Sequence, residues 1–209
     1  MHHFEQLTIE EQQLARTASI IGTSFTSDVL AAAVPEKLDI SVVSSVLNSL
    51  VSNHWLTVKT EIMPTGITTL EYTFAHPLVR NTLYELTPNS VRSSVHRAIA
   101  NHIEKTYKND PRFFTILGLH YSHSAVAPRK SYEYLTRAAN IGASLEEALL
   151  LVCMAKKHAQ SAADCAALLG VVQKCMQNAA AEVGRCPPLF TLFSCVWTRI
   201  GEVTQKGLG

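Results

Sequence analysis

A short segment near the middle of the chain joins a strand to a helix, and it limits the possible folds more than any other feature. In Tyr72-Thr-Phe-Ala-His76-Pro-Leu-Val-Arg80, apolar and polar residues alternate up to Phe74, and the alternation ends at His76-Pro77. Alternation with a period of two indicates a half-buried strand, whereas proline is favoured in the first turn of a helix. The segment therefore predicts a strand that leads directly into a helix, with Pro77 at position N1.

The residues before this segment predict three helices and a second strand. Thr8 followed by Glu11 is a capping box, so we expect a helix from Ile9 to about Ile21, ended by Gly22. The other expected elements are helices over 28–34 and from about residue 40, and strands over 55–61 and 67–74 joined by a turn at 63–66. Three helices and a β-hairpin predict a winged-helix domain, which we place at residues 1–86.

The remainder of the chain has a helical pattern. We expect helices to begin at Pro77, Pro88, Pro111 and Pro128, and after Ser144 and Ser161. Leu117-Gly-Leu-His-Tyr121, followed by aromatic and small residues at 132–139, has the spacing of a tetratricopeptide-repeat (TPR) helix pair. Residues 87–183 are therefore expected to start an α-helical solenoid, and the fold class is expected to be mainly α. Residues 184–209 lose the pattern, and we expect an irregular apolar tail with a truncated or altered C-terminus.

Composition and charge disfavour several classes of protein. Apolar residues make up 47% of the chain and charged residues 17%, which is typical of a packed core and not of a disordered chain. A net charge of +1 does not point to nucleic acid or to an anionic membrane. No apolar segment is long enough for a membrane span, no signal peptide is evident, and the five cysteines form no C-x-x-C pair. We expect a cytoplasmic chain with reduced thiols.

The sequence contains none of the common catalytic or cofactor motifs. It has no G-x-x-x-x-G-K-[ST] loop, no G-x-G-x-x-G, no G-x-S-x-G and no H-E-x-x-H. His120 and His123 share a predicted helix but have no further metal ligands nearby, so we expect them to serve packing. Three cysteines in the predicted helices are expected to be small core residues where helices cross: Cys153, Cys165 and Cys175. The chain is therefore expected to have no catalytic residue, no metal site and no cofactor of its own.

Four groups of residues, in their order along the chain, resemble one protein family. They are Ala15–Phe25, Phe74 to Tyr84, Arg92 to Ala100, and Leu119 to Ala139. Together they are similar to the winged-helix and TPR-like region of STAND-type signalling ATPases, and most of all to the middle region of soluble-type (class III) adenylyl cyclases. The resemblance runs from about residue 7 to about residue 159. The P-loop ATPase and cyclase domains of that family would lie upstream.

The resemblance implies a regulatory function without catalysis. The chain would be a segment of a signalling ATPase or of an adenylyl or guanylyl cyclase in cAMP signalling. It would couple nucleotide state to output by packing on ATPase or cyclase domains in cis, or bind a protein partner through its helices. ATP or ADP would be bound only by an upstream ATPase domain.

The resemblance also implies candidate site residues. In STAND ATPases the histidine of a Met-His-Asp motif reaches the β-phosphate of the bound nucleotide, and Ala75-His76-Pro77 is similar to that motif, although Pro77 replaces the aspartate. His76 is therefore the nucleotide-sensing candidate; the alternative is that it bonds to local backbone at the start of the helix. Four further residues could form a basic surface toward a nucleotide domain or an acidic partner: Arg80, Arg92, His96 and Arg97. The alternative for these four is a solvated face, with Leu83, Val95 and Ile99 turned inward.

Two other functions remain open from the sequence. One is a standalone helical-repeat adaptor that binds proteins. The other is a winged-helix DNA-binding regulator, which the expected recognition helix (residues 40–53) disfavours because it contains no lysine or arginine to neutralise phosphates. In either case the first domain needs a core, and we expect it to be formed by Leu50, Trp55, Phe74, Leu78, Leu83 and Tyr84.

Overall fold

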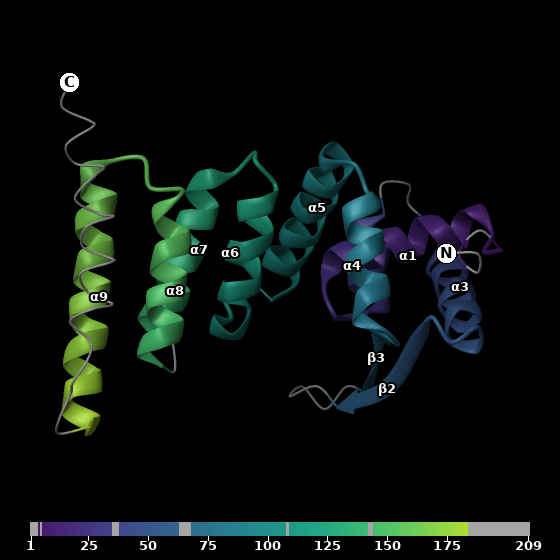
Figure 1. Cartoon of the computed structure of the whole chain (residues 1–209), viewed down its shortest axis with the longest axis horizontal. Helices are drawn as coiled ribbons and strands as arrows, with labels where there is room; N and C mark the ends of the chain where they lie inside the picture. Colours follow the sequence, from purple (N-terminus) through teal and green to yellow (C-terminus); the bar gives the residue numbers. More distant parts are fainter. Residues whose placement is uncertain are drawn as a thin grey trace. The chain divides into compact units, whose positions relative to one another are not determined.

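The computed structural model describes residues 4, 6–34, 38–62, 68–107, 109–141 and 144–183. These residues contain nine α-helices, a short 3-10 helix and three strands, which confirms the mainly α fold class (Figure 1). Their contacts divide the chain into two compact units. The first comprises the described residues of Met1–Lys108 with His123–Val126, and the second those of Asn109–Ser122 with Ala127–Gly209. The domain boundary expected at residue 86 differs from this division by one helix, α5.

The first unit contains every helix and strand that the sequence predicts up to residue 107. They are α1 (Ile9–Ile21), α2 (Ser27–Ala33), α3 (Ile40–Ser52), β2 (Leu56–Ile62), β3 (Thr68–Phe74), α4 (Pro77–Leu86) and α5 (Asn89–Tyr107). One further strand, β1 (Ser24–Thr26), was not predicted, because three residues are too few to show a period. The turn expected at 63–66 lies outside the described residues.

The boundaries of α1 and α4 follow from local chemistry. The Thr8 hydroxyl accepts a hydrogen bond from the Glu11 amide at 3.2 Å, and the Glu11 carboxylate accepts one from the Thr8 amide at 2.8 Å, which confirms the capping box. Gly22 ends α1 with an extended backbone (φ 160°, ψ −162°) in place of the left-handed conformation usual at such a stop. Pro77 occupies the first turn of α4, as predicted.

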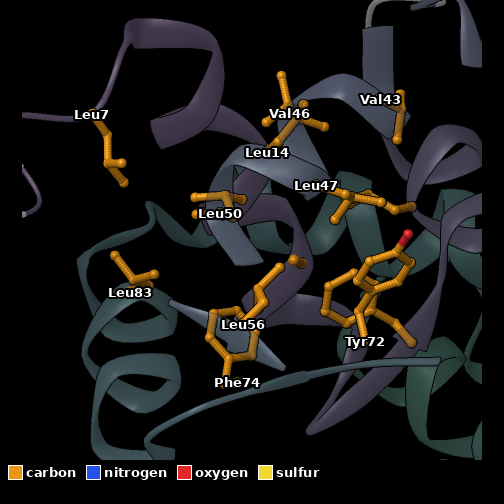
Figure 2. Close-up of a cluster of buried hydrophobic side chains, with 14 residues drawn as sticks. Leu7, Leu14, Val43, Val46, Leu47, Leu50, Leu56, Tyr72, Phe74 and Leu83 are labelled. Atoms are coloured by element: carbon orange, nitrogen blue, oxygen red, sulfur yellow. The ribbon is translucent and has the colours of Figure 1, made fainter. Parts of the chain in front are cut away.

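The three strands form one antiparallel sheet in the order β1-β3-β2. Phe25 lies opposite Tyr72 across the β1–β3 pair, and Leu56 lies opposite Phe74 across the β2–β3 pair. The Phe25 ring is within 6.0 Å of the Tyr72 ring and 6.2 Å of the Phe74 ring, measured between centroids. One face of the sheet thus supplies an aromatic layer to the core of the unit (Figure 2).

Helices α1, α2, α3 and α4 complete this core. Figure 2 shows leucine side chains from α1 and α3 directed toward Leu56 and Phe74. Of the six expected core residues, Leu50, Phe74 and Leu83 are buried, whereas Trp55 and Tyr84 are half-buried. The expectation is wrong for Leu78, whose side chain is 77% exposed. Helix α4 packs through Val79 and Leu83, which are four residues apart, and Leu78 lies one residue off that stripe.

The second unit is entirely helical in its described residues. Its elements are η1 (Pro111–Phe113), α6 (Phe114–His123), α7 (Pro128–Ile141), α8 (Leu145–Lys156) and α9 (Ala162–Val183). Side-chain oxygens cap three of the predicted starts: Asp110 accepts from the Arg112 amide, Ser144 from Glu147, and Ser161 from Asp164. No helix within the described residues is both apolar and long enough to cross a lipid bilayer.

Helices α6 and α7 approach each other closely at a glycine. A Cβ atom at Gly118 would lie only 2.6 Å from Leu135 Cγ, and the Ser131 hydroxyl of α7 donates to the Gly118 carbonyl at 3.0 Å. Leu135 is fully buried. Three residues of the next two helices are at most 3% exposed: Ala148 and Leu151 of α8, and Leu168 of α9. The core of this unit therefore combines small and aliphatic residues at helix crossings with buried aromatic rings, among them Phe114 and Tyr121. The expected C-terminal tail, 184–209, lies outside the described residues.

Candidate functional site

A pocket opens on the first unit where residues from the start of α1, the end of α3 and the start of α4 come together. Its volume is about 510 Å³. Small-ligand sites commonly occupy roughly 300–1,000 Å³. The pocket is lined by Gln6, Leu7, Glu11, Asn53, His54, Trp55, His76 and Val79. It therefore contains the residue that the sequence picks out most sharply, His76.

His76 stands at the junction of β3 and α4. It is the N-cap residue of α4, and its carbonyl accepts hydrogen bonds from the amides of Val79 at 3.0 Å and Arg80 at 3.4 Å. Its side chain is exposed and makes no capping hydrogen bond. The backbone and Pro77 thus start the helix without the imidazole. The alternative placed His76 at the start of α4 with bonds to local backbone, and its N-cap position and carbonyl bonds agree with that; its side chain makes no capping bond, and the residue also lines the pocket.

Glu11 provides a fixed carboxylate on another wall of the pocket. One carboxylate oxygen accepts from the Thr8 amide, and the other accepts from the Ser49 hydroxyl of α3 at 2.5 Å. The Ser49 hydroxyl, followed by the Thr8 amide, holds the pKa of Glu11 below its ordinary value. Glu11 therefore stays ionised at neutral pH while it joins α1 to α3.

His54 and Trp55 enter the pocket through the turn that ends α3. The Trp55 amide donates to the Leu50 carbonyl at 2.9 Å and the His54 amide to the Val51 carbonyl at 3.0 Å, which is the hydrogen-bond pattern of a Schellman motif. His54 occupies the position where glycine is usual, and its φ of 59° is left-handed. This conformation costs an L-residue about 1–2 kcal/mol. The pocket is thus built in part on a strained backbone.

Trp55 is held from two sides. The Trp55 carbonyl accepts a hydrogen bond from the Ala75 amide at 3.0 Å. The Trp55 backbone therefore lies beside the residue that precedes His76. Phe4 packs edge-on against the indole, with ring centroids 5.7 Å apart. The Arg16 guanidinium lies over the Phe4 ring, 5.7 Å from its centroid. Trp55 is therefore a half-buried residue of the pocket wall with an aromatic neighbour.

A second grouping, the Tyr84 cluster, consists of Arg80, Tyr84, Arg92 and His96. The guanidinium carbons of Arg80 and Arg92 lie 5.3 and 4.6 Å from the centroid of the Tyr84 ring. The Tyr84 hydroxyl lies 3.4 Å from His96 Nε2, and Arg92 also contacts Glu85 at 3.5 Å. Three of the four predicted basic residues thus meet around one tyrosine that sequence reasoning assigned only to the core.

The Tyr84 cluster is only partly exposed to solvent. His96 is only 5% exposed, and its ring stacks on that of His123 at a centroid distance of 4.9 Å. The Arg92 side chain is 18% exposed. Leu83, Val95 and Ile99 are buried, as that alternative expected, but His96 is buried with them, and Arg92 is half-buried with its guanidinium over the Tyr84 ring. The fourth predicted residue, Arg97, is exposed.

A third grouping ties α7 to the start of α9 in the second unit. Arg129 donates to the Asp164 carboxylate at 2.7 Å, and the amides of Gln160 and Ser161 donate to its other oxygen at 3.0 and 3.1 Å. The Tyr132 hydroxyl donates to the Asp164 carbonyl at 3.0 Å. Arg129 and these amides lower the pKa of Asp164 to about 2. These contacts all lie within the second unit, and they join α7 to the start of α9.

The remaining candidates are histidines and cysteines of the predicted helices. No cluster of three potential metal ligands occurs among the described residues. His120 is buried, and His123 is used by the stack on His96. The prediction that the cysteines are core residues is wrong for Cys153, which is exposed, whereas Cys165 and Cys175 are half-buried. Cys186 and Cys195 lie outside the described residues.

Sequence reasoning found one wall of the pocket and missed the others. Glu11 was recognised only as a helix cap, and Trp55 only as a core residue. His54 carries no sequence signal, since a glycine would have marked the left-handed turn and a histidine does not. No protein-family model matches the chain, and comparison with curated proteins and with solved structures likewise found no match.

Proposed function

We propose that this chain is a regulatory interaction module of a signalling ATPase or nucleotide cyclase. In this proposal a winged-helix unit reads the nucleotide state of an ATPase module, and TPR-like helices pass that state on or hold a partner. The observation that carries the proposal is the position of His76. His76 is exposed, lines a pocket at the strand-to-helix junction, and makes no side-chain capping bond to start the helix.

The element order supports a winged-helix assignment for the first unit. Helix, strand, helix, helix and a two-stranded hairpin follow one another, and the first strand pairs with the last in the order β1-β3-β2. A β-hairpin beside a three-helix core is the arrangement that defines a winged helix. Lys59 on β2 is the one basic side chain in the described part of the hairpin, and α3 has none. Such a surface is better suited to protein than to DNA, because non-specific DNA binding rests on basic side chains.

The packing of α6 on α7 supports a TPR-like assignment for the start of the second unit. Gly118 allows Leu135 to sit against the α6 backbone, and Ser131 bonds to the Gly118 carbonyl. Tyr121 and Tyr134 stack between the helices with ring centroids 5.9 Å apart. Small residues at the crossing and aromatic residues beside it are typical of repeat helices that stack on neighbours.

The proposed sensing step needs a donor that can reach a phosphate. An imidazole can donate a hydrogen bond to a phosphate oxygen, and its charge can change near neutral pH. The strand-to-helix junction holds His76 at a fixed place, because Ala75 bonds to Trp55 on one side and Pro77 sets the helix on the other. The Tyr84 cluster lies on the same helix and its neighbour, and would order α4 against α5 as nucleotide state changes.

The first test is to map the full transcript upstream of the Met1 codon. We expect the reading frame to continue into a G-x-x-x-x-G-K-[ST] loop. A stop codon just upstream of a message that begins at Met1 would rule out sensing in cis, and the protein-binding adaptor would then be the better assignment. In the longer protein, His76→Ala should weaken ADP binding about 10-fold or more, as loss of a charge-assisted hydrogen bond does.

The control for that variant is His54→Ala. It removes the other imidazole of the pocket, away from the strand-to-helix junction. ADP affinity measured by titration calorimetry should change less than about two-fold in this control. Equal losses in both variants, or no loss in either, would contradict the role proposed for His76.

A further inference from the structure

The pocket beside His76 has the charge of a site for an organic cation. If histidine is counted as neutral, Glu11 is the only ionised side chain among the described residues that line it. Its carboxylate is held in place by Thr8 and Ser49, and each oxygen keeps a further lone pair for a ligand. Leu7 and Val79 supply apolar surface around it. A carboxylate fixed in a partly apolar hollow attracts a positive group more strongly than one in open water does.

The aromatic wall favours a flat cation. Trp55 is half-buried, its backbone is bonded to Ala75, and Phe4 packs edge-on against its indole. Indole is the best aromatic partner for a cation, and a guanidinium group can stack on it while its N–H fork faces a carboxylate. A cation–π contact of this kind already occurs beside Trp55, where the Arg16 guanidinium lies over the ring of Phe4.

The other lining residues can satisfy the remaining donors of such a group. A guanidinium on an alkyl chain has five N–H donors and no acceptor. An imidazole in its neutral form has one acceptor nitrogen, which His54 and His76 could each supply, and the side-chain amide of Asn53 has an acceptor oxygen. An ammonium group would use fewer of these acceptors and would not stack.

We propose that this pocket binds an alkylguanidinium group, the head group of an arginine side chain, stacked on Trp55 and paired with Glu11. The strained backbone of His54 is the independent observation in its favour. Glycine would relieve the left-handed strain at this position, and strain of this kind is concentrated at functional sites. The proposal goes beyond nucleotide sensing, and its test uses this chain alone, so either can fail without the other.

The test is calorimetric titration of the full chain with N-acetyl-arginine N-methylamide. The matched ligand is N-acetyl-citrulline N-methylamide, which has nearly the same shape but a neutral urea. We expect saturable binding of the arginine compound, at least about 10-fold tighter than the citrulline compound. Agmatine distinguishes two sources of the guanidinium group. If agmatine binds more tightly than the capped arginine, the ligand is a free metabolite. If agmatine binds more weakly, the ligand is an arginine side chain of a protein.

The variants are chosen so that loss of binding differs from loss of fold. Glu11→Gln keeps a capping-box residue at its position but removes the charge, and it should weaken arginine binding at least about 10-fold. Glu10→Gln makes the same charge change one residue away, outside the pocket, and should leave affinity within about two-fold. His54→Gly should weaken binding while the chain becomes more stable. Equal affinity for both ligands, no saturable binding, or unchanged affinity in Glu11→Gln would overturn the proposal.

Discussion

Adding one methyl group at Gly118 is a stringent test of the second unit. An alanine Cβ there would lie 2.6 Å from Leu135 Cγ, 2.7 Å from Leu135 Cδ2 and 3.1 Å from the Leu135 backbone nitrogen. Favourable carbon contacts lie at about 3.5–4.0 Å. Leu135 is 0% exposed, so its side chain cannot turn out to solvent, and the backbone contact cannot be relieved by a rotamer change. Helices α6 and α7 would have to separate.

The magnitude follows from two opposing terms. Forcing a methyl group into a packed core costs typically about 1–3 kcal/mol, and contacts this short place Gly118→Ala in the upper half of that range. Replacing a glycine inside a helix by alanine stabilises by about 0.5–1 kcal/mol. The net expectation is a loss of about 1–2.5 kcal/mol in the free energy of unfolding.

Gly170→Ala is the matched control. Gly170 lies inside α9, and a Cβ there would meet nothing within 4 Å. The same substitution should therefore stabilise this position by about 0.5–1 kcal/mol. Urea unfolding followed by circular dichroism should show the two midpoints moving in opposite directions with unchanged m-values. If Gly118→Ala is as stable as the parent while Gly170→Ala behaves as expected, the close approach of α6 and α7 is refuted.

Three further predictions concern stability. Phe74→Ala removes a buried ring from the core of the first unit and should cost roughly 3–5 kcal/mol; a loss under about 1 kcal/mol by chemical denaturation would contradict its placement. His54→Gly should add about 1 kcal/mol, because glycine adopts the left-handed conformation without strain, and a loss of stability would show that the turn is built differently. Because the pKa of Asp164 falls from 3.8 to about 2 on folding, its contribution is fully present above about pH 4 and is lost as the pH falls toward 2. Asp164→Asn should flatten that part of a stability–pH curve, and an unchanged acid slope would count against the ion pair with Arg129.

Helix starts were predictable because their signals are local. Thr8 and Glu11, Pro77, Ser144 and Ser161 each act within one helical turn, so the chain near them decides the outcome whatever packs above. The alternation that ends at Phe74 likewise predicted β3 and its buried face. The mainly α class follows from such signals added along the chain.

Leu78 and Leu83 show that local sequence signals do not predict which face of a helix is buried. Both are leucines on one short helix, yet one is 77% exposed and the other 4%. Which side of α4 is buried depends on where α1 lies, and no pattern within α4 records that. The same holds for β1, which is a strand only because β3 pairs with it.

The sequence by itself therefore determined the helices, the hairpin and the position of His76 at a strand-to-helix junction, because caps, prolines and alternation act over a few residues. Only the tertiary structure decided that His76 shares a pocket with Glu11 and Trp55, which come from the start of α1 and the end of α3. It also decided that Tyr84 gathers two arginines and a histidine. The physical reason is that such meetings depend on contacts between segments far apart in the chain, whose free energies are summed over the whole core.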